Sequence, residues 1–295
     1  MIITDAAPEK NLKRLPDWLR RSLPEASAEN THAILEQYGL NTVCESAKCP
    51  NRSECYSHRT ATFMILGNAC TRRCGFCAVP TGREEIQADE PARVAQAAKD
   101  LGLQYVVLTS VARDDQPDEG AGHFAETVRA VYAAIPGVQV EVLTPDFHAR
   151  RELIAKIVAA RPRVYNHNVE TVARLQKKVR PQAAYDRSLE LLSTVKALDP
   201  DMTTKSGLML GLGETENEIL ETGRDLRAAG CDILTLGQYL SPGAEFLPVE
   251  KFFPPEFFTA MGQKLKALGF REVFAGPYVR SSYHAGETFL NSKNT

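Results

Sequence analysis

The stretch TFMILGNACTRRCGFC, residues 62–77, decides the fold because a short apolar run leads directly into three cysteines. Thr62–Leu66 has the length and composition of a buried strand. Cys70, Cys74 and Cys77 follow it with the spacing C-x3-C-x2-C. Three soft thiolates on one short loop suit three irons of a four-iron, four-sulfur cluster and leave the fourth iron without a protein ligand.

A second cysteine triplet lies just upstream, at Cys44, Cys49 and Cys55, and we call it the upstream triplet. A structural zinc site usually takes its ligands as two close pairs, whereas only one C-x2-C pair is present. Disulfides would need an oxidising compartment, yet the charged N-terminal segment does not resemble a signal peptide. Iron–sulfur chemistry is therefore favoured over both alternatives. Cys231 stands apart in an apolar run and is expected to be a buried apolar residue.

The composition predicts one large domain without a strong charge. The chain has 295 residues, 43% of them hydrophobic, and 35 basic against 37 acidic residues give a formal net charge of −2. This balance does not favour nucleic-acid or membrane binding, and no apolar stretch reaches the roughly 18 residues of a membrane span. Seven cysteines that are expected to be reduced suit the cytoplasm, so the protein is expected there.

Apolar runs of strand length alternate with segments of helical period, such as the one that carries Phe124, Val128 and Val131. Thr215 and Glu218 form a capping box between two of these segments. Such alternation implies right-handed crossovers and a parallel sheet. The expected strands are Thr62–Leu66, Tyr105–Thr109, Val138–Leu143, Arg163–Asn168, Thr203–Leu210, Asp232–Leu236 and Arg271–Ala275.

These units predict an α/β fold, an incomplete parallel (β/α) barrel of about six units. The glycines of Gly207–Gly213 could suggest a dinucleotide-binding fold, but Glu216 stands where that motif needs its last glycine. We expect three parts: an N-terminal extension, residues 1–55, irregular to about residue 51 and carrying the upstream triplet; the barrel, 56–275; and a C-terminal extension, 276–295.

The cysteines at 70–77 follow the first strand and so lie at the mouth where parallel barrels assemble their active sites. With Phe76 beside Cys77, this loop resembles that of the radical S-adenosylmethionine (SAM) superfamily. The resemblance implies a cluster whose open iron binds SAM and which, when reduced, cleaves SAM to methionine and a 5′-deoxyadenosyl radical. It also places Phe76 among the cofactor-binding residues.

The spacing of the upstream triplet and the segment Arg280-Ser-Ser-Tyr-His284 resemble the lipoyl synthase family. Residues 109–115, 166–171 and 205–214 are also typical of that family, so the resemblance covers nearly the whole chain. Ala112 stands where the family usually has a polar residue, which leaves open only the role of that side chain.

The resemblance implies a second, auxiliary four-iron, four-sulfur cluster, held by the upstream triplet with Ser282 as its fourth ligand. A serine taken alone is more often a turn residue, so this role rests on the resemblance. Oxygen is a harder ligand than thiolate and matches cluster iron less well, which would let that corner be released. Arg280 would orient the substrate or support the serine, and both residues are predicted to be catalytic.

The implied reaction inserts two sulfur atoms, at C6 and C8, into an octanoyl chain on a lysine of a lipoyl carrier protein. The auxiliary cluster supplies the sulfur, and two SAM molecules are consumed per product. The implied partners are lipoyl domains of 2-oxoacid dehydrogenases, the glycine cleavage H protein, a reduced electron donor and an iron–sulfur carrier that rebuilds the cluster. The alternatives are another sulfur-inserting enzyme, such as a methylthiotransferase or a biotin-synthase-like enzyme, and an electron-transfer or cluster-carrier protein.

Polar residues near the ends of three predicted strands are candidates for binding SAM. Thr109 and Ser110 would contact its methionine part, Asn168 and Glu170 its ribose or amino-acid part, and Lys205 its carboxylate. Each could instead only satisfy backbone groups at the barrel rim.

The remaining titratable groups are expected to be structural. Lys177, Lys178 and Arg180 could meet an acidic carrier protein, but a solvated helix face is the simpler interpretation. The histidines without metal-ligand spacing relative to one another are His123, His148, His167 and His284.

Overall fold

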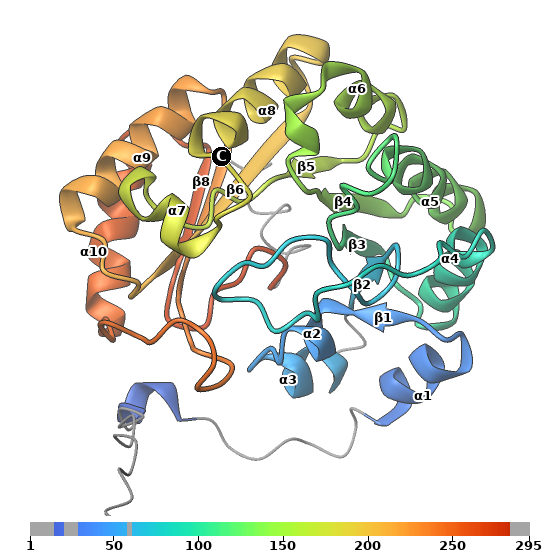
Figure 1. Cartoon of the computed structure of the whole chain (residues 1–295), viewed down its shortest axis with the longest axis horizontal. Helices are drawn as coiled ribbons and strands as arrows, with labels where there is room; N and C mark the ends of the chain where they lie inside the picture. Colours follow the sequence, from blue (N-terminus) through green and yellow to red (C-terminus); the bar gives the residue numbers. More distant parts are fainter. Residues whose placement is uncertain (1–14, 21–28, 58–60, 284–295) are drawn as a thin grey trace, which may run out of the picture.

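Seven of the apolar runs form neighbouring parallel strands in chain order, which confirms the predicted parallel α/β architecture (Figure 1). The computed structural model describes residues 15–20, 29–57 and 61–283. The seven strands are β2 Thr62–Ile65, β3 Tyr105–Ser110, β4 Gln139–Leu143, β5 Val164–Asn166, β6 Thr203–Leu210, β7 Ile233–Gln238 and β8 Glu272–Ala275.

The strand register carries one row of residues around the first half of the sheet. Thr62 pairs with Val107, Val107 with Glu141, Glu141 with Val164, and Val164 with Thr203. In the part of the chain that the structure describes, β8 pairs with β7 and with no strand beyond it. The sheet is therefore an open arc, as an incomplete barrel requires.

Helices cover the outer face of this arc, and the core lies between the two layers (Figure 1). Phe124, Val128 and Val131 are fully buried on one helix, as their spacing predicts. Strands β6 and β7 are buried on both faces, which is typical of parallel sheets. The covering helices are α4 Glu90–Asp100, α5 Ala121–Ala134, α6 Arg151–Ala159, α8 Tyr185–Leu198, α9 Glu216–Ala228 and α10 Pro255–Lys266. The shorter helical turns are η1 Asp17–Leu19, η3 Phe147–Ala149, η4 Ala173–Leu175 and α7 Gln176–Val179.

The predicted capping residue occupies its expected place. The Thr215 hydroxyl accepts a hydrogen bond from the Glu218 amide, and the Glu218 side chain bonds back to the Thr215 amide, so the capping box is complete.

No helix among the described residues is long and apolar enough to cross a bilayer.

The prediction that the chain is irregular to about residue 51 is wrong for its described part. Residues 29–57 form α1 Glu29–Gln37, β1 Asn41–Thr42, α2 Val43–Ser46 and α3 Arg52–Ser57, and β1 pairs antiparallel with β2. The elements β1, α2 and α3 are too short to show a period, and tertiary bonds hold this part of the chain. The Thr31 hydroxyl donates to the Tyr56 carbonyl at 2.8 Å, and the Thr42 and Tyr56 hydroxyls lie 2.8 Å apart.

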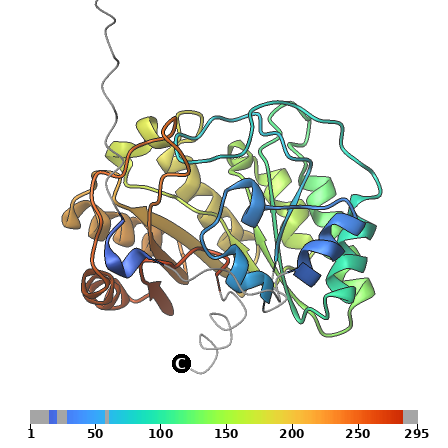
Figure 2. The same cartoon turned by 90° about the horizontal axis from the view of Figure 1, so that it is seen from below.

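Helices α2 and α3 lie at the open side of the arc, between its two ends (Figure 1). Figure 2 views this side directly and shows the same helices in front of the gap. The upstream triplet is thereby carried to the edge of the barrel, next to the cysteines that follow β2.

Candidate cluster and cofactor site

The cysteine loop, residues 70–77, is held by backbone bonds at its first cysteine and at its middle. The Cys70 amide donates to the Pro80 carbonyl at 2.8 Å, and the Gly82 amide donates to the Cys70 carbonyl at 2.9 Å. The Gly75 amide bonds to the Val179 carbonyl at 2.9 Å, so the middle of the loop is also fixed. The loop therefore presents its thiols from a defined backbone.

The cysteines of this loop form no disulfide and are partly buried. Burial raises the pKa of Cys74, and it raises the pKa of Cys77 to about 12. Two amides already face Cys70, since the amides of Ala112 and Arg72 donate to its sulfur at 3.3 and 3.4 Å. Partly buried thiols with amide donors nearby suit a metal cluster, whose binding supplies the energy for deprotonation.

The upstream triplet sits on one small turn-and-helix unit. Cys44 lies on α2, Cys49 in the following turn and Cys55 on α3. The Cys49 amide donates to the Cys44 carbonyl at 3.0 Å, and the Arg52 amide donates to the Cys49 carbonyl at 3.2 Å. Burial raises the pKa of Cys44 to about 11. The second donor set is thus also three thiols outside any disulfide, on a backbone fixed by local bonds.

Two adjoining cavities are lined by one cysteine of the upstream triplet, Cys49, and by two of the cysteine loop, Cys70 and Cys77. Cys77, Asn168 and Glu170 line both of them, which makes these residues the boundary between the two. The larger cavity, about 280 Å³, is lined among others by Cys49, Phe76, Cys77, Asn168, Glu170, Arg280 and Ser282. The smaller, about 200 Å³, is lined among others by Cys70, Cys77, Thr109, Ser110, Asn168 and Glu170.

The polar atoms at these cavities fit a polar ligand. The Ser110 hydroxyl and the Asn168 carbonyl oxygen are buried and have no hydrogen-bond partner among the described residues. Such atoms are normally satisfied in folded proteins, so a ligand that bonds to them would complete the site. Gly207 leaves room for the Asn168 side chain in the cavity wall. A Cβ at this position would lie 2.9 Å from the Asn168 carbonyl oxygen, which is too close.

Glu170 is held in a strained conformation beside Asn168. Its φ of +65° is unusual for a residue with a side chain. The Asn168 amide donates to the Glu170 carboxylate at 3.0 Å and to the Ser281 hydroxyl at 2.8 Å. Burial raises the pKa of Glu170, and the nearby Arg180 cation opposes this shift. Backbone strain of this kind is concentrated at functional sites.

The C-terminal segment, residues 276–283, brings Arg280 and Ser282 to the larger cavity. The Asn51 side chain donates to the Tyr278 carbonyl at 2.8 Å, and the Tyr283 hydroxyl donates to the Glu54 carboxylate at 2.7 Å. Both bonds join this segment to the unit that carries the upstream triplet. His284 lies outside the described residues.

The structure does not bring Lys205 to these cavities. Its ammonium lies 2.9 Å from the Glu141 carboxylate, and both side chains are 1% exposed. Thr109 lines the smaller cavity, but its hydroxyl already donates to the Leu143 carbonyl at 2.9 Å. Ser110, Asn168 and Glu170 are therefore the predicted cofactor residues with the best placement.

The interpretation of Lys177, Lys178 and Arg180 as one solvated face is wrong for Arg180. Its side chain is buried and donates to the Asn168 carbonyl at 2.9 Å and to the Val169 carbonyl at 3.2 Å. The two lysines are exposed, so only the arginine turns inward to support the cavity wall. The sequence does not reveal this difference, because the three basic residues lie within four positions of one another.

The described histidines have protein partners, as expected for structural residues. His123 lies 2.7 Å from Glu90, and His148 lies 2.8 Å from Glu119. His167 is buried between the Thr144 carbonyl and the Ser188 hydroxyl. Ser281 is a site residue that the sequence did not single out, although it stands beside Ser282.

The fold is shared with proteins of different overall sequence. The chain resembles the [FeFe]-hydrogenase maturase HydG with a TM-score of 0.56 at 12% identity, covering 82% of this chain and 62% of that one. It resembles Streptococcus suis SuiB bound to S-adenosylmethionine with a TM-score of 0.52 at 13% identity, covering 73% and 50%. At these identities the likeness concerns the fold alone.

The sequence itself matches the Radical SAM superfamily over residues 64–226. It is 55% identical to lipoyl synthase 2 of Thermosynechococcus vestitus, covering 92% of this chain and 97% of that protein. It is 52% identical to the lipoyl synthase of Thermus thermophilus, covering 98% and 91%. The chain belongs to the lipoyl synthase family within the radical SAM superfamily.

Proposed function

We propose that this chain inserts two sulfur atoms, at C6 and C8, into an octanoyl chain bound to a lysine of a lipoyl carrier protein. The observation that carries this proposal is that Cys77 and Cys49, one from each triplet, line the same cavity as Arg280 and Ser282. Radical formation and sulfur donation must reach the same carbon atoms, and a shared cavity allows this.

In the radical half, Cys70, Cys74 and Cys77 would hold a four-iron, four-sulfur cluster, which we call the radical cluster. When bound and reduced, this cluster supplies the electron that cleaves SAM into methionine and a radical able to abstract hydrogen from an unactivated carbon. The protein binds and orients SAM in this half. The Ser110 hydroxyl and the Asn168 carbonyl oxygen offer it buried hydrogen-bonding groups, and Phe76 adds an aromatic wall.

In the sulfur half, the upstream triplet and Ser282 would hold the auxiliary cluster, which is consumed as the sulfur source. A serine oxygen is a hard ligand on soft cluster iron, so it would release its corner more readily than a thiolate. Arg280 lies in the same cavity and would orient the substrate or support the serine. Without reassembly, such an enzyme stops after about one turnover, since its own cofactor is spent.

The larger cavity also carries apolar side chains that suit an octanoyl chain, including Val43, Leu208 and Met209. We propose as substrates the lipoyl domains of 2-oxoacid dehydrogenases and the glycine cleavage H protein. The cycle also needs a reduced electron donor and an iron–sulfur carrier. The thiol chemistry suits the reducing cytoplasm. In this proposal, residues 1–55 carry the cysteines of the auxiliary cluster, residues 56–275 form the barrel, and residues 276–295 carry the serine ligand.

The test uses anaerobically reconstituted protein with dithionite, SAM and an octanoyl-lysyl peptide, and follows the products by mass spectrometry. We expect two sulfur atoms to be gained, with two molecules of 5′-deoxyadenosine formed. A methylthio product would instead indicate the alternative sulfur-inserting chemistry. SAM cleavage without any gain of sulfur would refute the proposed reaction.

Replacement of Ser282 separates the two halves. Ser282→Ala should still cleave SAM but lose sulfur insertion, because only the auxiliary site contains this residue. Cys70→Ala should lose both activities. Unimpaired insertion by Ser282→Ala would remove the serine from the mechanism, and retained cleavage by Cys70→Ala would refute the radical-site assignment.

A further inference from the structure

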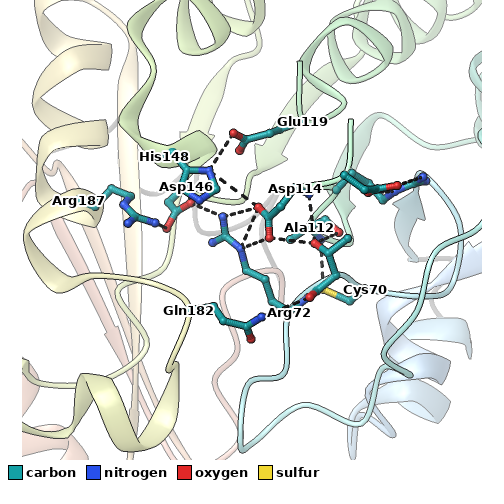
Figure 3. A network of polar contacts seen from close by, with 12 residues as sticks. Cys70, Arg72, Ala112, Asp114, Glu119, Asp146, His148, Gln182 and Arg187 are labelled. Atoms are coloured by element: carbon teal, nitrogen blue, oxygen red, sulfur yellow. Dashed lines mark hydrogen bonds and ion pairs between the residues drawn. The ribbon is translucent and has the colours of Figure 1, made fainter. Parts of the chain in front are cut away.

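Arg72, inside the cysteine loop, forms ion pairs with the segments that follow β3 and β4, and only its Asp146 partner is fully buried (Figure 3). Two nitrogens of its guanidinium donate to the Asp114 carboxylate, Nε at 2.9 Å and one terminal nitrogen at 2.7 Å. The same terminal nitrogen donates to Asp146 at 2.7 Å. The Arg72 side chain is only 5% exposed. Such a two-carboxylate contact uses the planar fork of arginine, which lysine lacks.

The contact with Asp114 is part of a tight docking of the cysteine loop on the segment that follows β3. The Thr71 amide donates to the Ala112 carbonyl at 3.1 Å, and the Thr71 hydroxyl donates to Asp114 at 2.9 Å. In this docked arrangement the Ala112 amide reaches the Cys70 sulfur at 3.3 Å. The position of the Cys70 thiol thus depends on how closely residues 71 and 72 are held.

Asp146 is the second anchor, and the backbone that presents it is strained. Its carboxylate is fully buried, and the Arg72 guanidinium holds the pKa of that carboxyl well below its usual range. Residues 147–149 follow it with φ values of +45°, +47° and +54°. The Asp146 carboxylate accepts a bond from the His148 amide at 3.2 Å, and this bond supports the turn. A costly left-handed turn that aims a buried charge at the cluster loop favours a function for that charge.

A metal ion is the alternative occupant of this corner. Ligand atoms of Asp114, Glu119 and His148 lie within 4.8 Å of one another. However, Arg72 already bonds to Asp114 twice, and Arg150 lies 3.1 Å from Glu119. These two arginines neutralise the negative charge of the carboxylates, so this group of side chains is better explained as an internal ion-pair network than as a cation site.

We propose that Arg72, Asp114 and Asp146 form a positioning clamp that keeps the Cys70 sulfur against the amides of residues 72 and 112 and thereby raises the reduction potential of the radical cluster. Hydrogen bonds to cluster sulfur stabilise the negative charge that reduction adds. A looser loop weakens these bonds, so the cluster becomes harder to reduce. This inference rests on the radical cluster that we assign to Cys70, Cys74 and Cys77.

The test measures the midpoint potential of the radical cluster in the reconstituted full chain. Electron paramagnetic resonance follows the signal that changes when SAM is added, which identifies the radical cluster. Arg72→Lys keeps the charge but loses the fork, and Asp146→Asn keeps the shape but loses the charge. Arg187→Lys is the matched control. Among the described residues, Arg187 contacts the other Asp146 oxygen, at 3.3 Å, and not Asp114, and the variant keeps the positive charge.

We expect both clamp variants to shift the midpoint to a more negative potential at unchanged iron and sulfide content, and the control to keep the wild-type value. With dithionite, their SAM cleavage should fall severalfold, and the stronger reductant titanium(III) citrate should restore it. Wild-type potentials in loaded Asp146→Asn protein would overturn the clamp, and so would slow cleavage that the stronger reductant does not restore. Should Arg72→Lys fail to assemble a cluster, Asp146→Asn decides alone. Wild-type protein that does not cleave SAM would refute the proposed function instead.

Discussion

Asn51 donates a hydrogen bond of 2.8 Å to the carbonyl oxygen of Tyr278, 227 residues further along the chain. Asn51 lies between Cys49 and Cys55, and Tyr278 lies shortly before Ser282. Asn51 is 1% exposed, and the bond is partly buried. It connects the two parts of the chain that we propose as ligands of one cluster.

Loss of the Asn51 side chain should loosen the C-terminal segment without affecting the radical site. Asn51→Ala removes the hydrogen bond to the Tyr278 carbonyl, at a cost of about 0.5–1.5 kcal/mol. We expect faster hydrogen exchange across residues 276–283 and weaker sulfur insertion, with SAM cleavage retained. Equal loss of both activities would show that Asn51 supports the whole fold and not this segment.

Gly237→Ala should displace the C-terminal segment by direct contact. A Cβ at this position of β7 would lie 1.9 Å from the Val279 carbonyl oxygen, which is far too close. Because a misplacement of about 1 Å can cost about 100-fold in rate, sulfur insertion should fall by about 10- to 100-fold. SAM cleavage should fall far less, and single-turnover product analysis measures both.

The matched control for Gly237 is Gly102→Ala. Gly102 has a φ of +69°, and a Cβ there would meet no atom within 4 Å. The substitution should therefore lower stability by about 1 kcal/mol from backbone strain and leave sulfur insertion unchanged. If both variants lose insertion equally, general destabilisation explains the loss at Gly237.

Lys205→Met should destabilise the fold and leave SAM binding intact. The buried Glu141 carboxylate would lose its cation, 2.9 Å away, although the Tyr105 hydroxyl and the Asn166 amide still bond to it. Breaking a buried pair from one side costs about 3–5 kcal/mol. Denaturant unfolding and the KM for SAM check this. A raised KM at unchanged stability would instead return Lys205 to the SAM site.

The stability of the cluster-free protein should fall as the pH decreases from about 6.5 to about 4, with His167 as a contributor. Burial and the Arg180 and Arg72 cations lower the pKa of His167 from 6.5 to about 4, against the opposing effect of Asp146. Below pH 6.5 the imidazole is protonated in the unfolded chain but stays neutral in the folded chain. This difference lowers the free energy of unfolding by about 1.4 kcal/mol per pH unit. The loss is complete near the folded pKa.

The check compares unfolding free energies of wild type and His167→Gln under reducing conditions. Gln cannot titrate, so its curve should be flatter between pH 6.5 and 4. The acidic groups Asp115 and Glu218, whose pKa values are lowered to about 2 by Arg113 and Arg174, act mainly below this window. Parallel curves for both proteins would contradict the assignment to His167.

Much of the barrel was predictable because parallel strands and their helices have local signals. The run from Thr62 to Leu66 and the capping box at Thr215 depend on neighbouring residues, and both appear where the sequence predicts them. The short elements α2 and α3 could not be predicted, because elements of this length have no period and are held by distant bonds such as that between Thr31 and Tyr56.

The sequence by itself determined the two cysteine triplets, the parallel α/β architecture and the membership of the family, because ligand spacing and strand patterns lie within short windows. Only the tertiary structure decided that Lys205 pairs with Glu141, that Arg180 turns inward, and that Ser282 reaches the cavity of Cys49. The physical reason is that a charged or polar side chain takes whichever partner the packed barrel brings within bonding distance. That partner can lie more than 200 residues away, as for Asn51 and Tyr278, and local periodicity carries no information about it.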